Sequence, residues 1–409
     1  MGPIALFDKS FLQSLSEDES VWFDQFFMAV VCPIFFLETL ANLAKESSSK
    51  GPPEKIVGVI ASRFPEFGGK PVAHHVTLCQ NDLLGAAIPM RAQIPMDGAR
   101  PVLHQGKPAA VFKESPTAAA FSRWMHGDFN GLERDFAKKW RASLDAIDLR
   151  AIAAKFKRFG LEGKRFGSLD DVKSAIDELI SSTRSRFDMM ELAVTLAQLP
   201  PERQRSSFDS WTQANRPSLK QFAPFAAHVT AVELFFQLAI NSDLISPDRN
   251  SNRMDIAYLF YLPFCMTFVS SDKLHRKCAS LFMRPDQSFT WGIDLKADLA
   301  QLNRHYLQLP EDVRDKGISH FASQPPPDWN GTTTDIWDQH FPKWREKKKE
   351  ESTPEELKKV FDRLKDVGEA PPIPLGVPMP AADDLNIVAL EHMVQKKKGS
   401  WFQLPKHSD

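Results

Sequence analysis

Four acidic side chains in this sequence stand where short apolar runs end or where a helix is expected to begin. They are Asp8 after Ile4–Phe7, Glu38 after Cys32–Phe36, Asp255 at the start of an apolar helical stretch, and Asp272 after the run that ends in Ser270 and Ser271. The carboxyl ends of parallel strands meet at one edge of a sheet, where open α/β sheets place their binding sites. We therefore predict that these carboxylates converge on one crevice.

Four carboxylates in one crevice would repel one another strongly without a cation to hold them together. Mg²⁺ and Mn²⁺ are hard ions that prefer carboxylate and water oxygens, so either ion would suit such a cluster. A bound ion lowers the pKa of its water, which can then attack phosphorus, and a second ion can stabilise the leaving oxygen. The predicted chemistry is hydrolysis of phosphodiester bonds, with all four acids as metal ligands and catalytic residues.

Residues close to Asp272 are assigned supporting roles. We expect Ser270 to orient Asp272 or a metal-bound water, and Lys273 and Arg276 to hold a substrate phosphate. A basic run within residues 134–165 could add phosphate contacts, although the solvated face of an amphipathic helix is the preferred interpretation of that run. The lysines at 396–398 are interpreted as surface charge.

Each acid also has a structural interpretation. Asp8, Asp255 and Asp272 can cap the helices that follow them, and Ser270 and Ser271 compete for the last of these caps. Glu38 can be a favourable partner of a helix dipole. Taken alone, Asp8 is better explained as a cap, and only the register of all four acids favours a shared site.

The elements expected around the first two acids form a compact α/β unit. We predict a strand at Ile4–Phe7, a helix over Lys9–Leu15, a helix over Val21–Val30 capped by Ser20, a strand at Cys32–Phe36 and a helix over Leu37–Lys45. This order of elements in a short stretch indicates parallel strand pairing.

Farther along the chain the pattern is irregular at first and then helical. No elements are predicted between residues 47 and 133. Helices are predicted over residues 134–160, 171–198 and 225–241, followed by a helix from Asp255 that is broken at Pro263, a strand that ends on Asp272 and a helix over Lys273–Phe282. Beyond residue 290 we expect helical patches and Pro-rich linkers, the clearest of them at 366–382.

The composition is that of an ordinary globular protein, with 409 residues, 43% of them hydrophobic and 25% charged. The net charge is −1, so any nucleic-acid contact must come from a local basic face. The four cysteines form no CxxC pair and are predicted to be reduced. The longest apolar runs, Phe26–Leu37 and Ile256–Val269, are shorter than the ~20 residues that a membrane helix needs, and no signal peptide is visible. We expect a soluble, cytoplasmic protein without membrane contact.

Four stretches together resemble the PIN-domain family of ribonucleases: IALFDKSFLQSL, CPIFFLETLANL, MDIAYLFYLPFCMTF and FVSSDK. In that family the first strand ends in an aspartate, a glutamate opens the helix after the second strand, a third acid begins a later helix, and the next strand ends in a V-T/S-x-D-like sequence. These roles fall on Asp8, Glu38, Asp255 and Asp272, with Ser270 beside the last. The resemblance implies a parallel sheet between helices and a Mg²⁺- or Mn²⁺-dependent endonuclease that acts on RNA in preference to DNA. Many relatives are toxins, which implies a regulatory or antitoxin protein as a partner.

The expected organisation departs from a compact member of that family. We predict a PIN-like α/β core from residues 1–46 and 221–290, an insertion over 47–220 that is irregular and then helical, and a C-terminal extension over 291–409 that is helical or irregular. Two alternatives remain open. One is a non-catalytic PIN-like scaffold that binds nucleic acid or a protein partner, and the other is a mostly helical interaction protein.

Overall fold

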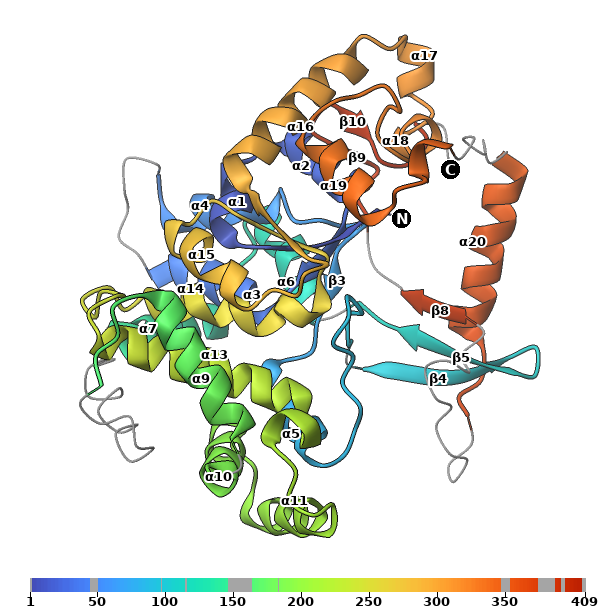
Figure 1. Cartoon of the computed structure of the whole chain (residues 1–409). Helices are drawn as coiled ribbons and strands as arrows, with labels where there is room; N and C mark the ends of the chain where they lie inside the picture. Colours follow the sequence, from blue (N-terminus) through green and yellow to red (C-terminus); the bar gives the residue numbers. More distant parts are fainter. Residues whose placement is uncertain are drawn as a thin grey trace.

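The centre of the computed structural model is a sheet of five parallel strands in the order β3-β2-β1-β6-β7 (Figure 1). The strands are β1 (Ile4–Phe7), β2 (Met28–Val31), β3 (Lys70–Pro71), β6 (Thr267–Ser270) and β7 (Ser288–Trp291). The structure describes residues 2–44, 51–96, 98–114, 116–145, 164–182, 184–346, 354–373, 387–390 and 394–406. Helices flank the sheet, so the predicted class, an α/β fold with a parallel sheet between helices, is confirmed.

The strand order changes direction between β1 and β6. The chain builds β1, β2 and β3 outward to one edge, and β6 and β7 then extend the sheet on the other side of β1. β1 and β6 are direct neighbours, with Ala5 opposite Thr267 and Phe7 opposite Val269. Ligands of open α/β sheets bind in the crevice outside the carboxyl ends of the strands at such a switch point.

Short helices connect these strands and carry most of the residues of interest. They are α1 (Lys9–Ser14), α2 (Glu17–Phe26), α3 (Pro33–Leu40), the 3₁₀ helix η1 (Ala41–Ala44), α4 (Pro53–Ala61), α14 (Asn252–Ala257), η3 (Tyr258–Phe264), α15 (Lys273–Cys278) and η4 (Ala279–Leu281). Local sequence sets their starts: Ser16 and Glu19 form a capping box at α2, and Pro33 occupies the first turn of α3, where its missing N–H costs nothing.

A group of helices lies below the sheet in Figure 1, arranged around the buried helix α13 (Pro224–Asn241). Its members are α5 (His75–Leu83), α9 (Leu169–Ser181), α10 (Arg186–Leu196), α11 (Pro201–Gln213) and α12 (Leu219–Phe222), while α6 (Pro116–Met125) and α7 (Gly131–Asp145) lie nearer the sheet. α13 is apolar nearly all round, which is why it is buried on every side. In the described part of the chain, no helix is both long and apolar enough to cross a membrane.

The C-terminal third contributes to the same core and adds a small separate module. The helices here are α16 (Gly292–Leu307), α17 (Glu311–Arg314), α18 (Ile318–Phe321), α19 (Thr332–His340) and η5 (Trp344–Glu346), and the strands β9 (Lys397–Lys398) and β10 (Trp401–Phe402) form a hairpin beside them.

The small module lies at the right of Figure 1 and has an apolar cluster of its own. It combines two strands from earlier in the chain, β4 (Ala99–His104) and β5 (Lys107–Phe112), with β8 (Ile387–Leu390) and α20 (Pro354–Glu369) from the C-terminal third. A larger cluster of buried apolar residues extends from Ala5 to Trp401. Nothing in this arrangement tests the predicted domain boundaries, which stay a prediction.

The second strand and the helices around it were placed wrongly. α2 begins after Ser16 rather than Ser20, β2 is Met28–Val31, and the expected strand Cys32–Phe36 is instead the cap and first turns of α3. Glu38 therefore lies in the second turn of α3 and not in the first turn of a helix that follows a strand Cys32–Phe36, as predicted. The apolar run from Phe26 to Leu37 contains a helix end, a strand and a helix start, and hydrophobic periodicity cannot divide it.

Other differences concern shorter features. The third strand of the central sheet and the hairpin β4–β5 fall between residues 47 and 133, where no element was predicted, and the predicted helix over 171–198 is two helices. Part of the predicted helix over 134–160 lies outside the described residues, as do four of the basic residues in the run over 134–165. Lys398 is buried, so interpreting 396–398 as surface charge was wrong for this residue. All four cysteines are buried and free, as predicted.

Candidate carboxylate site at the sheet edge

Asp8 is fixed at the carboxyl end of β1 by three hydrogen bonds. Its Oδ1 accepts the Phe11 N–H at 2.9 Å, which makes it the N-cap of α1, and its Oδ2 accepts the hydroxyls of Ser10 at 2.6 Å and Ser270 at 2.9 Å. Only 3% of the residue is exposed. Asp8 is thus a cap and a member of a side-chain network at once, so the two interpretations of this residue are not exclusive.

Ser270, the last residue of β6, joins two of the acids. Its Oγ donates to Asp8 and accepts the backbone N–H of Asp272 at 2.9 Å. The Nδ1 of His275 lies 2.8 Å from the same oxygen and 3.5 Å from Asp8 Oδ2. Because β1 and β6 are paired with Phe7 opposite Val269, the next residues, Asp8 and Ser270, lie side by side at the carboxyl ends of the two strands.

The hydrogen bonds of His275 require both ring nitrogens to carry protons. The single hydroxyl proton of Ser270 points to Asp8, so Nδ1 must donate to the Ser270 oxygen. Nε2 lies 2.5 Å from the backbone carbonyl of Asp255, which can only accept. Burial alone would lower the pKa of His275, but Asp8 and Asp255 raise it to about 9. A buried imidazolium therefore lies within the acidic cluster.

The same imidazolium acts on Asp8. Burial would raise the pKa of the Asp8 carboxyl, but contact with His275, together with the bonds from Ser10 and Phe11, lowers it below its usual value. Asp8 is consequently ionised throughout the neutral range.

Asp255 reaches the cluster from α14, and a second ion pair fixes that helix. Arg253 donates both terminal nitrogens to Glu233 of α13, at 2.5 and 2.7 Å. This two-point contact ties α14 to the buried helix α13, which holds the backbone of α14 near Asp255, two residues later. Asp255 itself is 8% exposed.

Asp255 is the least satisfied of the four acids. Its buried Oδ2 has no hydrogen-bond partner among the described residues, and its closest cation is the Arg249 guanidinium at 3.9 Å. Burial raises the pKa of Asp255, the negative charges of Glu38 and Asp272 raise it further, and His275 and Arg249 only partly oppose them, so that it lies at about 7. The carboxyl is thus half protonated near neutral pH, in a place where two other carboxylates act on it.

Glu38 points from α3 towards the same cluster. Its Oε2 accepts the hydroxyl of Tyr258 at 2.6 Å, and its Oε1 lies 3.5 Å from Lys9 Nζ. Tyr258 also accepts the backbone N–H of Lys9 at 3.3 Å, which joins α3, α1 and η3. Burial and the charge of Glu38 raise the pKa of Tyr258 well above its ordinary value, so that it remains a hydrogen-bond donor.

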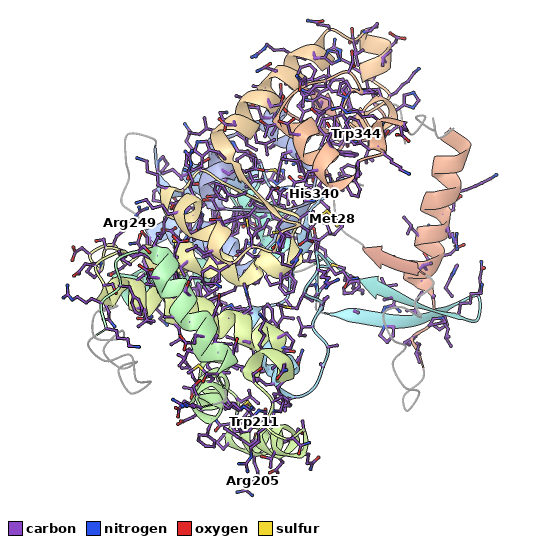
Figure 2. The ribbon with its side chains drawn as sticks, in the orientation of Figure 1. Met28, Arg205, Trp211, Arg249, His340 and Trp344 are labelled. Carbon is purple, nitrogen blue, oxygen red and sulfur yellow. The ribbon has the colours of Figure 1, made fainter. Side chains whose placement is uncertain are left out.

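Asp272 and Arg249 form the more open side of the cluster. Asp272 caps α15 by accepting the Leu274 N–H on Oδ1 at 2.6 Å, and its Oδ2 lies 3.9 Å from Arg249. The Arg249 side chain is 61% exposed, and the residue lies at the left margin of the molecule in Figure 2. Arg249 therefore faces two acids without a close hydrogen bond to either.

The two predicted phosphate-binding residues lie on α15. Lys273 and Arg276 are both exposed, and the Arg276 guanidinium lies 5.0 Å from the centre of the Trp291 ring. Lys273 has the freer side chain and is one residue from Asp272. Neither residue forms an ion pair with the four acids in the described structure.

All four predicted acids and Ser270 thus belong to one connected network. Its basic and phenolic members, Lys9, Arg249, His275 and Tyr258, were not predicted as part of the site. Tyr258 follows Asp255 by three positions, and His275 follows Asp272 by three, so each lies on the same helix face as its acid. That spacing was a usable signal. Arg249 lies in a loop before α14, where nothing local indicates contact with the site.

The donor set suits a hard divalent cation, although the present side-chain positions do not enclose one. The charges of Glu38 and Asp272 act on Asp255, and one buried oxygen of Asp255 has no hydrogen-bond partner among the described residues. In the described residues, however, no group of three or more His, Cys, Asp or Glu side chains is arranged to hold a metal ion. Lys9, Arg249 and His275 supply the positive charge in the described structure.

Comparisons of the chain with protein-family models, curated proteins and solved structures found no match. The resemblance to PIN-domain ribonucleases therefore rests on the sequence motifs alone.

Proposed function

We propose that this protein is a PIN-like, divalent-metal-dependent nuclease that hydrolyses phosphodiester bonds, with RNA preferred over DNA. The observation that carries the proposal is Asp255, a buried carboxyl with a pKa of about 7 on which the charges of Glu38 and Asp272 act. One of its oxygens has no hydrogen-bond partner in the described part of the chain. An acid that only caps a helix is stabilised by backbone N–H groups and does not require burial beside other negative charges. Perturbed acids grouped in a crevice are typical of sites that bind a cation or move protons.

Under this proposal Asp8, Glu38, Asp255 and Asp272 would hold one or two Mg²⁺ or Mn²⁺ ions. When bound, such an ion supplies an activated water and a counter-charge for the phosphate oxygens. Ser270 and His275 hold Asp8 in place and keep it ionised. Tyr258 orients Glu38, and Arg249 must move away from Asp255 and Asp272 for both to bind a cation. Arg249 and Lys273 are then available for substrate phosphate.

A second function, a PIN-like scaffold that binds without cutting, is favoured by other contacts. Asp8 and Asp272 are both satisfied caps, and Glu38 already has two partners, Lys9 and Tyr258. In a scaffold these residues need no ion. A regulatory or antitoxin partner is compatible with either function and rests on the resemblance alone.

The test is cleavage of end-labelled single-stranded RNA and DNA by the purified protein in Mn²⁺, Mg²⁺ or EDTA. We expect metal-dependent cleavage that Asp8→Asn abolishes, because asparagine keeps the Phe11 cap but removes the charge. Asp272→Asn is the second variant, since its cap is also preserved and its side chain is more exposed. Asp294→Asn is the matched control, because Asp294 is an exposed first-turn acid just after the neighbouring strand β7.

Absence of cleavage, together with absence of Mn²⁺ binding by calorimetry, would favour the scaffold. Cleavage that survives both Asp8→Asn and Asp272→Asn would place the chemistry elsewhere.

A further inference from the structure

A groove runs between α1 and α4, directly beside the carboxylate cluster. It has a volume of about 450 Å³, and the residues that line it are Ser10, Gln13 and Ser14 from α1 and Lys55, Ile56, Val59 and Arg63 from α4 and the turn that follows it. Among the described residues, no acidic side chain lines it. A lone phosphate would fill only a small part of this volume, so the shape suits an extended ligand.

One lining residue connects the groove to the cluster. The Ser10 hydroxyl donates to Asp8 Oδ2 at 2.6 Å, so the inner end of the groove lies at the acid that follows β1. Lys9, the preceding residue, already contacts Glu38. A ligand in the groove would consequently lie next to residues that contact two of the four acids.

The groove presents cations and neutral donors. The Lys55 side chain is exposed and has no ion pair among the described residues, while Arg63 is half-buried and donates through Nη1 to the Gln13 carbonyl. The Nε of Arg63 is buried without a hydrogen-bond partner in the described structure. The bond from Arg63 to Gln13 ties α1 to the turn that follows α4 and fixes the guanidinium at the groove.

The acids nearest to these cations lie outside the groove. Glu17 and Glu19 at the start of α2 act electrostatically on Arg63, and Glu19 is itself paired with Lys296 at 2.5 Å. Glu54, which precedes Lys55, is paired with Arg134 of α7. Lys55 thus remains the freest cation of the groove.

We propose that this groove binds the sugar-phosphate backbone of the nucleic-acid strand next to the phosphate that is cut. Lysine, arginine, serine and glutamine are the side chains that contact phosphates and sugars in nucleic-acid complexes. The exposed edges of Ile56 and Val59 offer apolar surface to the sugar rings. The inference rests on the proposed nuclease function, and it names the surface that guides the strand to the acids.

The test is binding of a short fluorescein-labelled single-stranded RNA, followed by anisotropy in EDTA so that no cleavage occurs. We expect Lys55→Glu and Ser14→Glu each to weaken binding about fivefold to tenfold at low salt, because each places a negative charge in the groove. Lys55→Ala should also reduce the slope of log affinity against log salt by about 0.7, the contribution of one phosphate of a single strand. Lys220→Glu is the matched control, since Lys220 is exposed on α12 and does not line the groove.

Each remaining outcome has one meaning. If the wild type binds and cleaves RNA but the groove variants bind as it does, or no more weakly than Lys220→Glu, the groove proposal is wrong and the nuclease survives. If binding depends on Lys55 but no metal-dependent cleavage occurs, the nuclease is wrong and the groove belongs to a binding scaffold. If the RNA binds neither in EDTA nor to Asp8→Asn in Mn²⁺, the groove proposal is overturned.

Discussion

Buried aspartates lie at both ends of the strands of the central sheet, and the hydrogen bonding of their carboxylates differs sharply. At the amino ends of the strands, Asp24 of α2 accepts the backbone N–H groups of Glu66, Phe67 and Gly68 at 2.8, 2.8 and 2.6 Å. At the carboxyl ends, Asp255 is nearly as buried, but one of its oxygens has no hydrogen-bond partner among the described residues and two acids act on it. Asp24 thus holds the loop at residues 66–68 in place, whereas Asp255 is a buried acid under the influence of two other negative charges.

The comparison of Asp24 with Asp255 shows that burial alone does not distinguish a structural acid from a candidate functional one. Burial is the largest influence on the pKa of both residues and raises each of them. The neighbours differ: Asp24 has three backbone donors and the positive charge of Lys398. Asp255 has the negative charges of Glu38 and Asp272, which the positive charges of His275 and Arg249 only partly oppose. Natural proteins satisfy most buried polar groups, so a group that stays unsatisfied calls for a functional explanation.

The largest expected difference between the two edges is in catalysis. Asp255→Asn should lower metal-dependent RNA cleavage by roughly a thousandfold, because one of the proposed cation ligands loses its charge. Asp24→Asn should leave the rate per folded molecule within about twofold, since Asp24 lies at the other end of the strands. Single-turnover cleavage, normalised to the folded fraction by circular dichroism, measures both. An equal loss of cleavage rate in the two variants would mean that Asp24 and Asp255 do not differ in their importance for catalysis.

The next difference is in stability, and here Asp24 is the more important residue. Asp24→Asn should lower the free energy of unfolding by about 2–4 kcal/mol, because an amide group replaces an oxygen that accepts buried N–H groups. The loop has little room to adapt, since a Cβ at Gly68 would lie 2.3 Å from the Phe27 carbonyl oxygen. Urea unfolding of the two proteins at pH 7 gives the value. A loss below about 0.5 kcal/mol would mean that water replaces these bonds.

Much of the structure at the carboxyl ends of β1 and β6 could be predicted from the sequence. Ile4–Phe7 is a short apolar run followed at once by an N-cap residue, so strand, helix and the position of Asp8 all follow from local signals. Asp272 was placed by the same reasoning. The clamp made by Asp24 has no such signal, because its three donors are more than forty positions away and are backbone groups.

The second strand shows why the rest was harder to predict. Pro33 follows an apolar run and looks like part of a strand, yet it begins a helix because its fixed φ suits the first turn. β3 has only two residues and β7 four, too few for an alternating pattern to be recognised. The buried imidazolium of His275 depends on contacts with Asp8, Ser270 and Asp255 that only the tertiary structure creates.

The smallest expected effect is in the pH dependence of stability. The pKa of Asp255 is about 7 in the folded protein, above the ordinary aspartate value of 3.8 that applies to the unfolded chain, so between these values the folded state keeps a proton that the unfolded chain has released. Linkage then requires the stability of the wild type to fall as pH rises through this window, and the loss to remain above it. Asp255→Asn has no such proton, so it should become more stable than the wild type by about 1–2 kcal/mol at pH 8.

The measurement for this last prediction is the difference in unfolding free energy between Asp255→Asn and the wild type at pH 5, 6, 7 and 8. Groups that do not interact with Asp255 cancel in the difference. His275 cancels only in part, because the charge of Asp255 contributes to its raised pKa, and its effect falls towards pH 9, above the window in which Asp255 titrates. The difference should grow up to about pH 7 and then level off. A difference that is constant with pH would show that Asp255 is ionised throughout, and the argument for an unsatisfied acid would lose its basis. Added Mn²⁺ should abolish the advantage of the variant, because only the wild type keeps all four proposed ligands.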